Sequence, residues 1–265
     1  MTRRRLDAEL VRRGLARSRE HASQLIAEGR VKAGGQVAGK AATQVETGSA
    51  IVVQDAEAGP EYVSRGGHKL AGALDAFTGL EVAGRRCLDA GASTGGFTDV
   101  LLRRGAAHVD AVDVGYGQIA WSLRTDERVT VIERVNVREL TPAMLEGAPG
   151  LVVGDLSFIS LRLVLGPLRA CADAEADYAM MVKPQFEVGK ERVGAGGVVR
   201  EPELRAEAVR GVADHAAALG LGVRGVTASP LPGPSGNVEY FLWLRAGAPP
   251  LDEAGLAKAI AEGPR

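Results

Sequence analysis

The sequence of 265 residues is long enough for one α/β domain of ordinary size and a small companion domain. Apolar residues make up 46% and charged residues 25% of it, which is typical of a compact globular protein and excludes a disordered or fibrous one. The net charge of −1 is unevenly distributed, because residues 1–40 contain ten Arg or Lys and four Asp or Glu. A basic end predicts polyanion binding there, although a solvated charged surface would give the same count.

The sequence contains no stretch near the roughly 20 uninterrupted apolar residues of a membrane span, and its N-terminus lacks the apolar core of a signal peptide. We therefore expect a cytoplasmic protein without membrane association. Cys87 and Cys171 have no metal-type spacing and are expected to be small buried apolar residues. No metal site is predicted.

The first part of the chain is predicted to be a small α+β domain. Two short helices are expected over residues 6–11 and 18–26, the second capped by Ser18, and each is followed by a glycine that ends it. Short strands are expected on both sides of the Gly34-Gly35 turn and at residues 51–53. The predicted boundaries are 1–57 for this domain, 58–64 for a linker without apolar periodicity, and 65–265 for a second domain.

In the second domain, apolar strand-like runs alternate with helix-like runs, which predicts a doubly wound, Rossmann-like α/β sheet. The last two strands are expected to form an antiparallel hairpin at the sheet edge. The expected strands are residues 87–89, 109–113, 129–132, 151–155, 178–182, 223–228 and 238–244, and the expected helices are 69–77, 97–104, 119–123, 161–171 and 201–219.

A glycine-rich turn follows the first strand of this domain and is the predicted cofactor site, since ligands of open α/β sheets bind beyond the carboxyl ends of the strands. Its spacing, G-x-x-x-G-G, places Ser93 where a dinucleotide fingerprint has its second glycine. The acidic residue at the strand end suits the ammonium group of S-adenosylmethionine and would repel a pyrophosphate. A tight turn without a ligand is the simplest alternative. The turn residues expected to bind the cofactor are Asp89, Gly91, Ala92, Ser93, Gly95, Gly96 and Phe97.

Two later strand ends complete the predicted cofactor site. Asp113, 22 residues after Gly91, ends the second strand and is placed to accept the ribose hydroxyls of adenosine. Asn136 follows the third strand and either meets the adenine or caps a loop. Together these residues favour a class I methyltransferase sheet with S-adenosylmethionine as cofactor.

Methyl transfer is an in-line displacement that requires an aligned nucleophile and, for a hydroxyl, a base. Four residues from separate points of the second domain are candidates for this work: Lys69, Asp155, Lys183 and Glu239. If the two lysines lie close together, each lowers the affinity of the other for a proton, so that one can act as a base. Asp155 would then hold the reactive amine and the hydroxyl in line, and Glu239 could fix the second lysine or the ribose. The alternative for each residue taken singly is a solvated charge.

The sequence closely resembles the TlyA proteins, which are often called hemolysins, over essentially the whole chain. The resemblance is carried by residues 64–70, 88–98, 155–160, 182–187 and 232–240. It implies 2'-O-methylation of cytidine in ribosomal RNA by a domain similar to the FtsJ-type ribose methyltransferases. The Lys-Asp-Lys-Glu tetrad of those enzymes maps onto the four candidates above, with Lys183 as the usual base. One departure is Pro60-Glu61-Tyr62 in the linker, where the family places an Arg and a Trp.

The N-terminal part resembles the small RNA-binding fold of a ribosomal protein, the αL motif. The resemblance implies phosphate contacts that position RNA without reading its sequence. We expect a monomer that binds ribosomal RNA within ribosomal subunits. The expected RNA-binding residues are Arg3, Arg4, Arg5, Arg17, Arg19, Arg30, Lys32 and Arg65.

Three other functions are consistent with parts of the sequence. A membrane-active hemolysin would need a surface-active helix, and the expected helices have charged faces. A non-catalytic RNA-binding factor for ribosome assembly would not need two lysines at the site. A dinucleotide oxidoreductase would need the missing second glycine.

Overall fold

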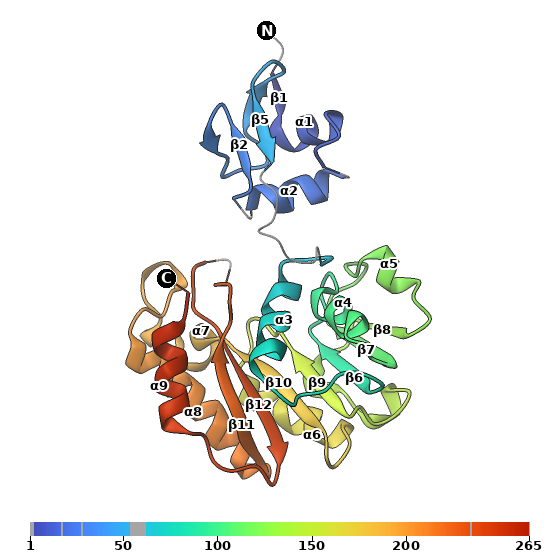
Figure 1. Ribbon diagram of the computed structural model, residues 1–265, viewed down its shortest axis with the longest axis vertical. Helices are drawn as coiled ribbons and strands as arrows, with labels where there is room; N and C mark the ends of the chain where they lie inside the picture. The colour runs from blue at the N-terminus through green and yellow to red at the C-terminus, as the bar shows by residue number, and fades with distance from the viewer. Residues whose placement is uncertain (1–2, 17, 28, 54–61, 234, 265) are drawn as a thin grey trace. The chain divides into compact units, whose positions relative to one another are not determined.

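The computed structural model describes residues 3–16, 18–27, 29–53, 62–233 and 235–264, and the chain divides into two compact units, Met1–Glu61 and Tyr62–Arg265 (Figure 1). The exact predicted boundaries of the linker, 58–64, stay a prediction, since residues 54–61 lie outside the described part.

The first unit packs two helices, α1 (Leu6–Arg12) and α2 (Arg19–Ala27), against short strands. Both helices were expected, and the Ser18 hydroxyl caps α2 by accepting a hydrogen bond from the backbone N–H of His21 at 3.1 Å. The core between the elements is apolar and includes Leu6, Leu10 and Leu25. The strands form two small sheets, β1 (Arg3–Arg5) with β4 (Gln44–Glu46), and β2 (Val31–Ala33) between β3 (Gln36–Val37) and β5 (Ile51–Val53).

The second unit is built on a seven-stranded sheet in the order β11-β12-β10-β9-β6-β7-β8. All pairs are parallel except those of β12, which runs antiparallel to β10 and β11. The expected hairpin is therefore present at the sheet edge, with β12 as the reversed strand and β11 outside it. The strands are β6 (Arg86–Ala90), β7 (His108–Asp113), β8 (Val129–Glu133), β9 (Leu151–Gly154), β10 (Asp177–Val182), β11 (Leu221–Ala228) and β12 (Tyr240–Ala246).

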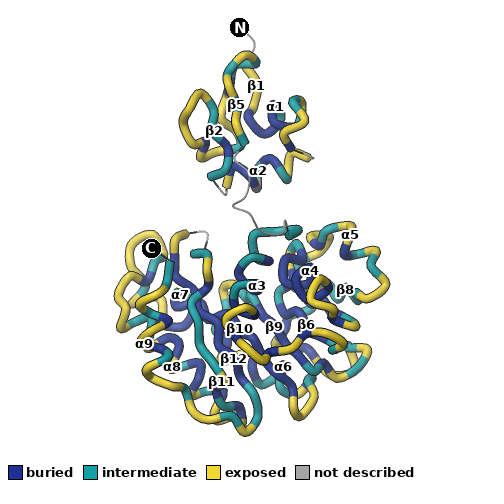
Figure 2. The backbone as a smooth tube through the Cα atoms, in the orientation of Figure 1, coloured by how far each residue is buried: buried dark blue, intermediate teal, exposed yellow. Residues whose placement is uncertain are grey.

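Helices cover both faces of this sheet, and the alternation of side chains along the strands explains how. On β10, Ala179 and Met181 face the core under α3, α4 and α5, whereas Tyr178 and Met180 face the core under α6, α8 and α9. Figure 2 shows the central strands β6, β9, β10 and β12 largely in the colour of buried residues, whereas the outer strands β8 and β11 are mostly intermediate. The helices are α3 (Gly66–Ala76), α4 (Gly96–Arg103), α5 (Trp121–Arg124), α6 (Leu165–Cys171), α7 (Pro184–Glu187), α8 (Pro202–Ala218) and α9 (Glu253–Glu262).

The main differences from the expected elements are short or terminal segments. Helices α7 and α9 were not expected, and the expected helix 161–171 begins as a 3₁₀ turn before α6. Cys87 and Cys171 are free and buried, as predicted. The 3₁₀ turns are η1 (Val137–Glu139), η2 (Pro142–Met144), η3 (Leu161–Leu163), η4 (Lys190–Arg192) and η5 (Ala195–Gly197).

Candidate active site

The carboxyl ends of the parallel strands β6, β7, β9 and β10 meet at one edge of the sheet, and two adjoining cavities lie there. The smaller, about 270 Å³, is lined by the glycine turn, by α3 and by both candidate lysines. The larger, about 780 Å³, extends past the ends of β7 and β8. Their shared walls are Gly91, Ser93, Asp155 and Ser157. Sheet topology thus brings residues from distant parts of the sequence to one site.

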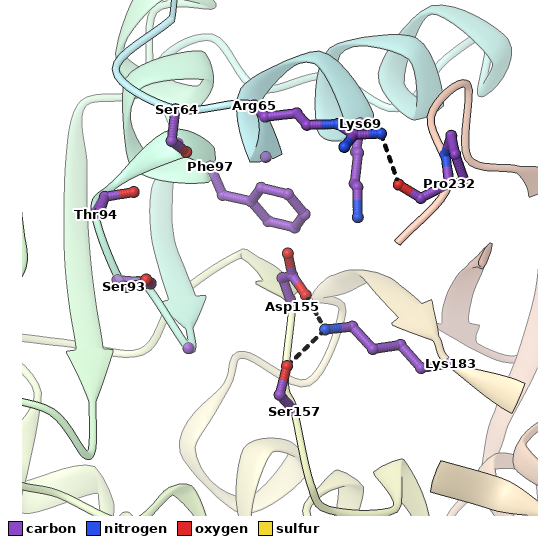
Figure 3. A pocket seen from close by; sticks show the side chains of 14 residues that line it. Ser64, Arg65, Lys69, Ser93, Thr94, Phe97, Asp155, Ser157, Lys183 and Pro232 are labelled. Atoms are coloured by element: carbon purple, nitrogen blue, oxygen red, sulfur yellow. Dashed lines mark hydrogen bonds and ion pairs between the residues drawn. The ribbon is translucent and has the colours of Figure 1, made fainter. Parts of the chain in front are cut away.

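In the smaller cavity, Lys183 points towards Asp155 and Ser157 (Figure 3). Its Nζ atom lies 2.6 Å from Asp155 Oδ1 and donates a hydrogen bond to Ser157 Oγ at 2.8 Å. Lys183 leaves the end of β10, and the next residue, Pro184, begins α7, so the side chain emerges at the strand end. Asp155 is partly exposed to solvent, whereas Lys183 is buried.

The other candidate pair lies on the opposite wall. Lys69, in the first turns of α3, donates a hydrogen bond of 2.5 Å to Glu239 Oε2, and both side chains are buried. Each lysine thus has a carboxylate of its own. The contact between Glu239 and Lys69 is the one that the sequence allowed for Glu239 as a partner of the second lysine. All four tetrad residues lie in or beside one cavity.

The glycine turn approaches the ligand site closely because its backbone adopts conformations that side chains disfavour. Gly91 has φ +86°, and a Cβ atom there would lie 2.7 Å from the carbonyl oxygen of Asp155. Gly95 has φ +94°, and its missing side chain leaves room for Ile119 and Leu123. Ser93, which occupies the place of a fingerprint glycine, is also left-handed, with φ +49°. The turn therefore keeps its backbone open towards both cavities.

Asp89 lies behind this turn and is not among the residues that line either cavity. Its carboxylate is fully buried, with Oδ2 accepting a hydrogen bond from the Thr98 hydroxyl at 2.7 Å and Oδ1 without a partner among the described residues. Burial raises the pKa of Asp89 to about 7, and the nearby carboxylate of Asp155 acts in the same direction. A buried oxygen without a partner fits a positively charged ligand group that reaches it past the glycines.

The larger cavity contains the two predicted adenosine contacts. Asp113 accepts hydrogen bonds from the backbone N–H of Ser93 at 2.8 Å and of Gly115 at 2.6 Å, one on each oxygen. Each oxygen retains a further lone pair for a ribose hydroxyl. Asn136 caps η1 by accepting a hydrogen bond from the N–H of Arg138 at 3.1 Å, which is the loop-capping alternative. Its contact with adenine stays a prediction.

The site also contains residues that the sequence did not lead us to select individually. Phe158 has φ +62°, leaves 92% of its surface exposed, and contacts Phe186 with ring centroids 5.3 Å apart. Both rings line the larger cavity, as does Gln185, whose buried Oε1 has no partner among the described residues. In the sequence they were noted only as parts of the runs 155–160 and 182–187. Their positions in the cavity could not be predicted without the fold.

Glu187 fixes the loop that carries these groups. Its buried carboxylate accepts hydrogen bonds from Ser160 Oγ at 2.6 Å and from the backbone N–H of Leu161 at 2.7 Å, and Arg162 contacts it at 3.3 Å. Because Glu187 ends α7, it ties the loop after β9, which supplies Asp155 and Ser157, to the helix that follows Lys183. The contacts of Glu187 therefore stabilise the segments that carry both Lys183 and Asp155.

Several of the predicted RNA-binding arginines of the first unit form ion pairs with carboxylates. Arg5 and Arg19 both bind the buried Asp7, at 3.0 and 2.9 Å, and hold the pKa of that carboxyl well below its usual range. Arg3 lies 3.9 Å from Glu46. The network leaves guanidinium groups exposed at the surface but fixes their positions.

The remaining predicted RNA contacts differ in location. Arg65 belongs to the second unit, where it lines the smaller cavity and donates a hydrogen bond to the carbonyl of Pro232 at 2.9 Å. Arg4 is exposed on β1, and Lys32 is half-buried on β2. Arg30 is also half-buried. Arg17 lies outside the described residues.

The sheet order, the reversed β12 strand and the cavity at the carboxyl ends define a Rossmann-like methyltransferase. Comparison with known families agrees, since the FtsJ-like methyltransferase family matches residues 62–246 and the S4 domain matches residues 4–51. The chain belongs to the TlyA family of FtsJ-like methyltransferases with an N-terminal S4 domain. A methyltransferase family implies S-adenosylmethionine as cofactor, and an S4 domain implies binding to RNA.

Three relatives show how far the similarity extends. The 16S/23S rRNA (cytidine-2'-O)-methyltransferase TlyA of Mycobacterium tuberculosis is 61% identical over 98% of this chain and 98% of that protein. Hemolysin A of Brachyspira hyodysenteriae is 37% identical over 89% of this chain and 98% of that protein. A solved structure from Streptococcus thermophilus, described provisionally as a hemolysin, has a TM-score of 0.78 and 36% identity, covering 99% of this chain and 96% of that one.

Within the described residues, none of the helices has the length and apolar character needed to cross a membrane.

Proposed function

We propose that this protein methylates the 2'-hydroxyl of cytidine ribose in ribosomal RNA, with S-adenosylmethionine as the methyl donor. The observation that carries the proposal is the Lys183–Asp155 pair at 2.6 Å on the wall shared with the glycine turn. This pair supports the proposal because transfer to a hydroxyl requires a proton acceptor beside the cofactor. The 61% identity to the Mycobacterium tuberculosis enzyme supports the choice of reaction and substrate.

The residues at the strand ends fit the proposed cofactor. Its ammonium group would be held by the unpaired Oδ1 of Asp89 beyond the glycines, and its ribose hydroxyls by Asp113. The left-handed backbone at Gly91 and Ser93 lets main-chain N–H groups face it. When bound, the cofactor supplies an electrophilic methyl group on a sulfonium. Asn136 is the proposed contact of the adenine.

Lys183 is the proposed general base. Because its amine must be neutral to accept a proton, its own proton first moves to Asp155 Oδ1, which lies in contact with it. Nζ would then take the proton of the acceptor hydroxyl as that oxygen attacks the methyl carbon, and the bond from this carbon to sulfur would break with its electron pair left on sulfur. Asp155 is partly exposed and releases its proton to solvent. Lys69, held by Glu239, keeps a positive charge on the opposite wall and orients the ribose.

Phe158 is placed to receive the base of the acceptor nucleotide. Its ring stands in solvent at the mouth of the larger cavity, next to Phe186, and a base whose ribose faces Lys183 would stack on it. The S4 domain supplies phosphate contacts that hold the RNA but do not select the base.

The direct test is mass-spectrometric mapping of methylated riboses after incubation of unmodified ribosomal subunits with the protein and S-adenosylmethionine. We expect one added methyl group at the 2'-oxygen of a defined cytidine. Methyl groups on a base, or on riboses without nucleotide preference, would contradict the proposal. Absence of transfer with intact cofactor and RNA binding would favour a non-catalytic RNA-binding factor.

We further expect the affinity for S-adenosylmethionine to rise as the pH increases through about 7, because the ammonium group needs Asp89 ionised and burial raises its pKa to about 7. In Asp89→Asn the affinity should be weaker and nearly independent of pH between 6 and 8. Calorimetric titration at several pH values measures both.

The free energy of unfolding should fall over the pH range in which the affinity for S-adenosylmethionine rises. The folded carboxyl of Asp89 keeps its proton to a higher pH than the unfolded chain, so the free energy of unfolding falls as the pH rises from about 4 to about 7. Asp89→Asn removes this loss and should raise Tm at pH 8 by about 2–4 °C, the shift that ~1 kcal/mol produces in a chain of this size. Asp110→Asn is the matched control, since Asp110 is also buried with a raised pKa but lies within β7 beside Arg86 and His108, and not at a strand end next to the glycine turn. An equal effect of both variants on cofactor affinity would contradict the role of Asp89.

A further inference from the structure

The segment between β7 and α5 exposes large apolar side chains next to the active site. Those of Val114, Tyr116 and Trp121 are 72%, 68% and 74% exposed. Figure 2 shows this part of the chain, around α5, as exposed surface. Clusters of exposed aromatic and aliphatic side chains are uncommon on a protein without a partner at that place. None of these three residues has a role in the chemistry proposed above.

The backbone around these side chains is fixed. The N–H of Gly115 binds Asp113 at 2.6 Å, that of Gly117 binds Glu133 at 2.7 Å, and that of Ala120 binds the carbonyl of Thr94 at 3.1 Å. The segment is thus attached to Asp113, the proposed contact of the cofactor ribose, and to the glycine turn. The exposed side chains are held outwards by these contacts and are not the tips of a loose loop.

The guanidinium group of Arg134 adds a positive charge to this surface. Arg134 adopts a left-handed conformation, with φ +60°, and places its guanidinium over the ring of Tyr116 at 4.2 Å from the centroid. Within the described part of the chain, no carboxylate forms an ion pair with Arg134 or with the neighbouring exposed Arg138. A carboxylate that is nearby, Glu133, is taken by Arg124. The surface therefore combines faces for stacking with a guanidinium group that forms no ion pair among the described residues.

We propose that an exposed surface next to the active site binds unpaired nucleotides of the RNA that flank the acceptor nucleotide. We term it the 114–121 surface, and it consists of Val114, Tyr116, Trp121 and Arg134. The inference rests on the proposed function, since it extends the path of the substrate. Val114 also lines the larger cavity, so the surface continues from the proposed place of the acceptor base. Bases stack on Tyr116 and Trp121, and a phosphate between them binds Arg134. Stacking is tolerant of sequence, so the surface holds the RNA strand without selecting it.

The two tryptophans of the chain provide a direct test. Trp121 is exposed, whereas Trp243 is only 6% exposed and donates a hydrogen bond to Asp177. Addition of a single-stranded oligocytidylate to the full-length protein should quench Trp121 emission, and quenching should disappear in Trp121→Phe, where only Trp243 emits. Trp121→Ala should weaken binding of the oligonucleotide by about 5- to 100-fold, and Trp121→Phe should retain most of the affinity. Met144→Ala, at another exposed apolar side chain of the same unit, should change neither.

Quenching that persists in Trp121→Phe, or equal affinity in Trp121→Ala and the wild type, would overturn the proposal. Quenching by S-adenosylmethionine alone would also overturn it, since the surface would then belong to the cofactor. Methyl transfer from S-adenosylmethionine to unmodified ribosomal subunits, measured with the same protein preparations, separates the two proposals. Quenching without methyl transfer would support the 114–121 surface as an RNA-binding site and count against the proposed reaction. Methyl transfer with an unchanged KM for RNA in Trp121→Ala would support the proposed reaction and count against the surface.

Discussion

Replacement of Lys183 by alanine is expected to lower methyl transfer by about 10²–10⁴-fold while leaving the affinity for S-adenosylmethionine within about twofold of the wild type. The lysine contacts Asp155 and Ser157 at the cavity wall, and the residues proposed to hold the cofactor come from the ends of β6, β7 and β8. Its loss therefore removes the proton acceptor and leaves the cofactor contacts in place. Single-turnover transfer to ribosomal subunits and calorimetric titration of the cofactor measure the two quantities.

Two further variants make the result specific. Lys183→Arg retains a positive charge but cannot serve as a base near neutral pH, so it should be nearly as inactive as the alanine variant. Lys258→Ala removes an exposed lysine of α9 that lies in neither cavity, and it should transfer methyl groups at the wild-type rate. Normal turnover in Lys183→Ala would remove the general-base assignment. A parallel loss of cofactor affinity would show instead that Lys183 supports the shape of the cavity.

Deletion of residues 1–61 is expected to weaken binding to ribosomal RNA by at least about tenfold at moderate salt and to flatten its salt dependence. Each phosphate contact contributes about 0.9 to the slope of log K against log salt, so the loss of four or five contacts lowers the slope by about 4. Filter binding at several salt concentrations measures both. Since the first unit has an apolar core of its own and the second has a core on each face of its sheet, cofactor binding by the shortened chain should be unchanged and is the control.

An unchanged salt slope after this deletion would show that the basic N-terminal unit is not the electrostatic contact with RNA. The remaining contacts would then lie on the second unit, where Arg65 lines the smaller cavity and Arg138 the larger one.

The sequence by itself determined the two-domain plan, the sheet and the position of the cofactor turn, because these depend on local patterns. Apolar runs of period two, glycines at helix ends and Ser18 as a cap act over a few residues, and each produced the expected element. The last two strands were likewise expected to pair. Boundaries differed by a few residues, and the pairing of β1 with β4 escaped notice because Arg3–Arg5 has no apolar alternation.

Only the tertiary structure decided how the charged groups of the site are paired. The sequence left open whether the two lysines lie close together and whether Glu239 holds a lysine or the ribose, whereas the fold pairs Lys69 with Glu239 and Lys183 with Asp155. These partners lie 170 and 28 positions apart in the sequence, and their contact follows from strand order and from the reversal of β12. Burial is also a property of the whole fold. It places Asp89 behind the turn with a raised pKa, and it leaves Phe158, Tyr116 and Trp121 in solvent although their residue types favour the interior.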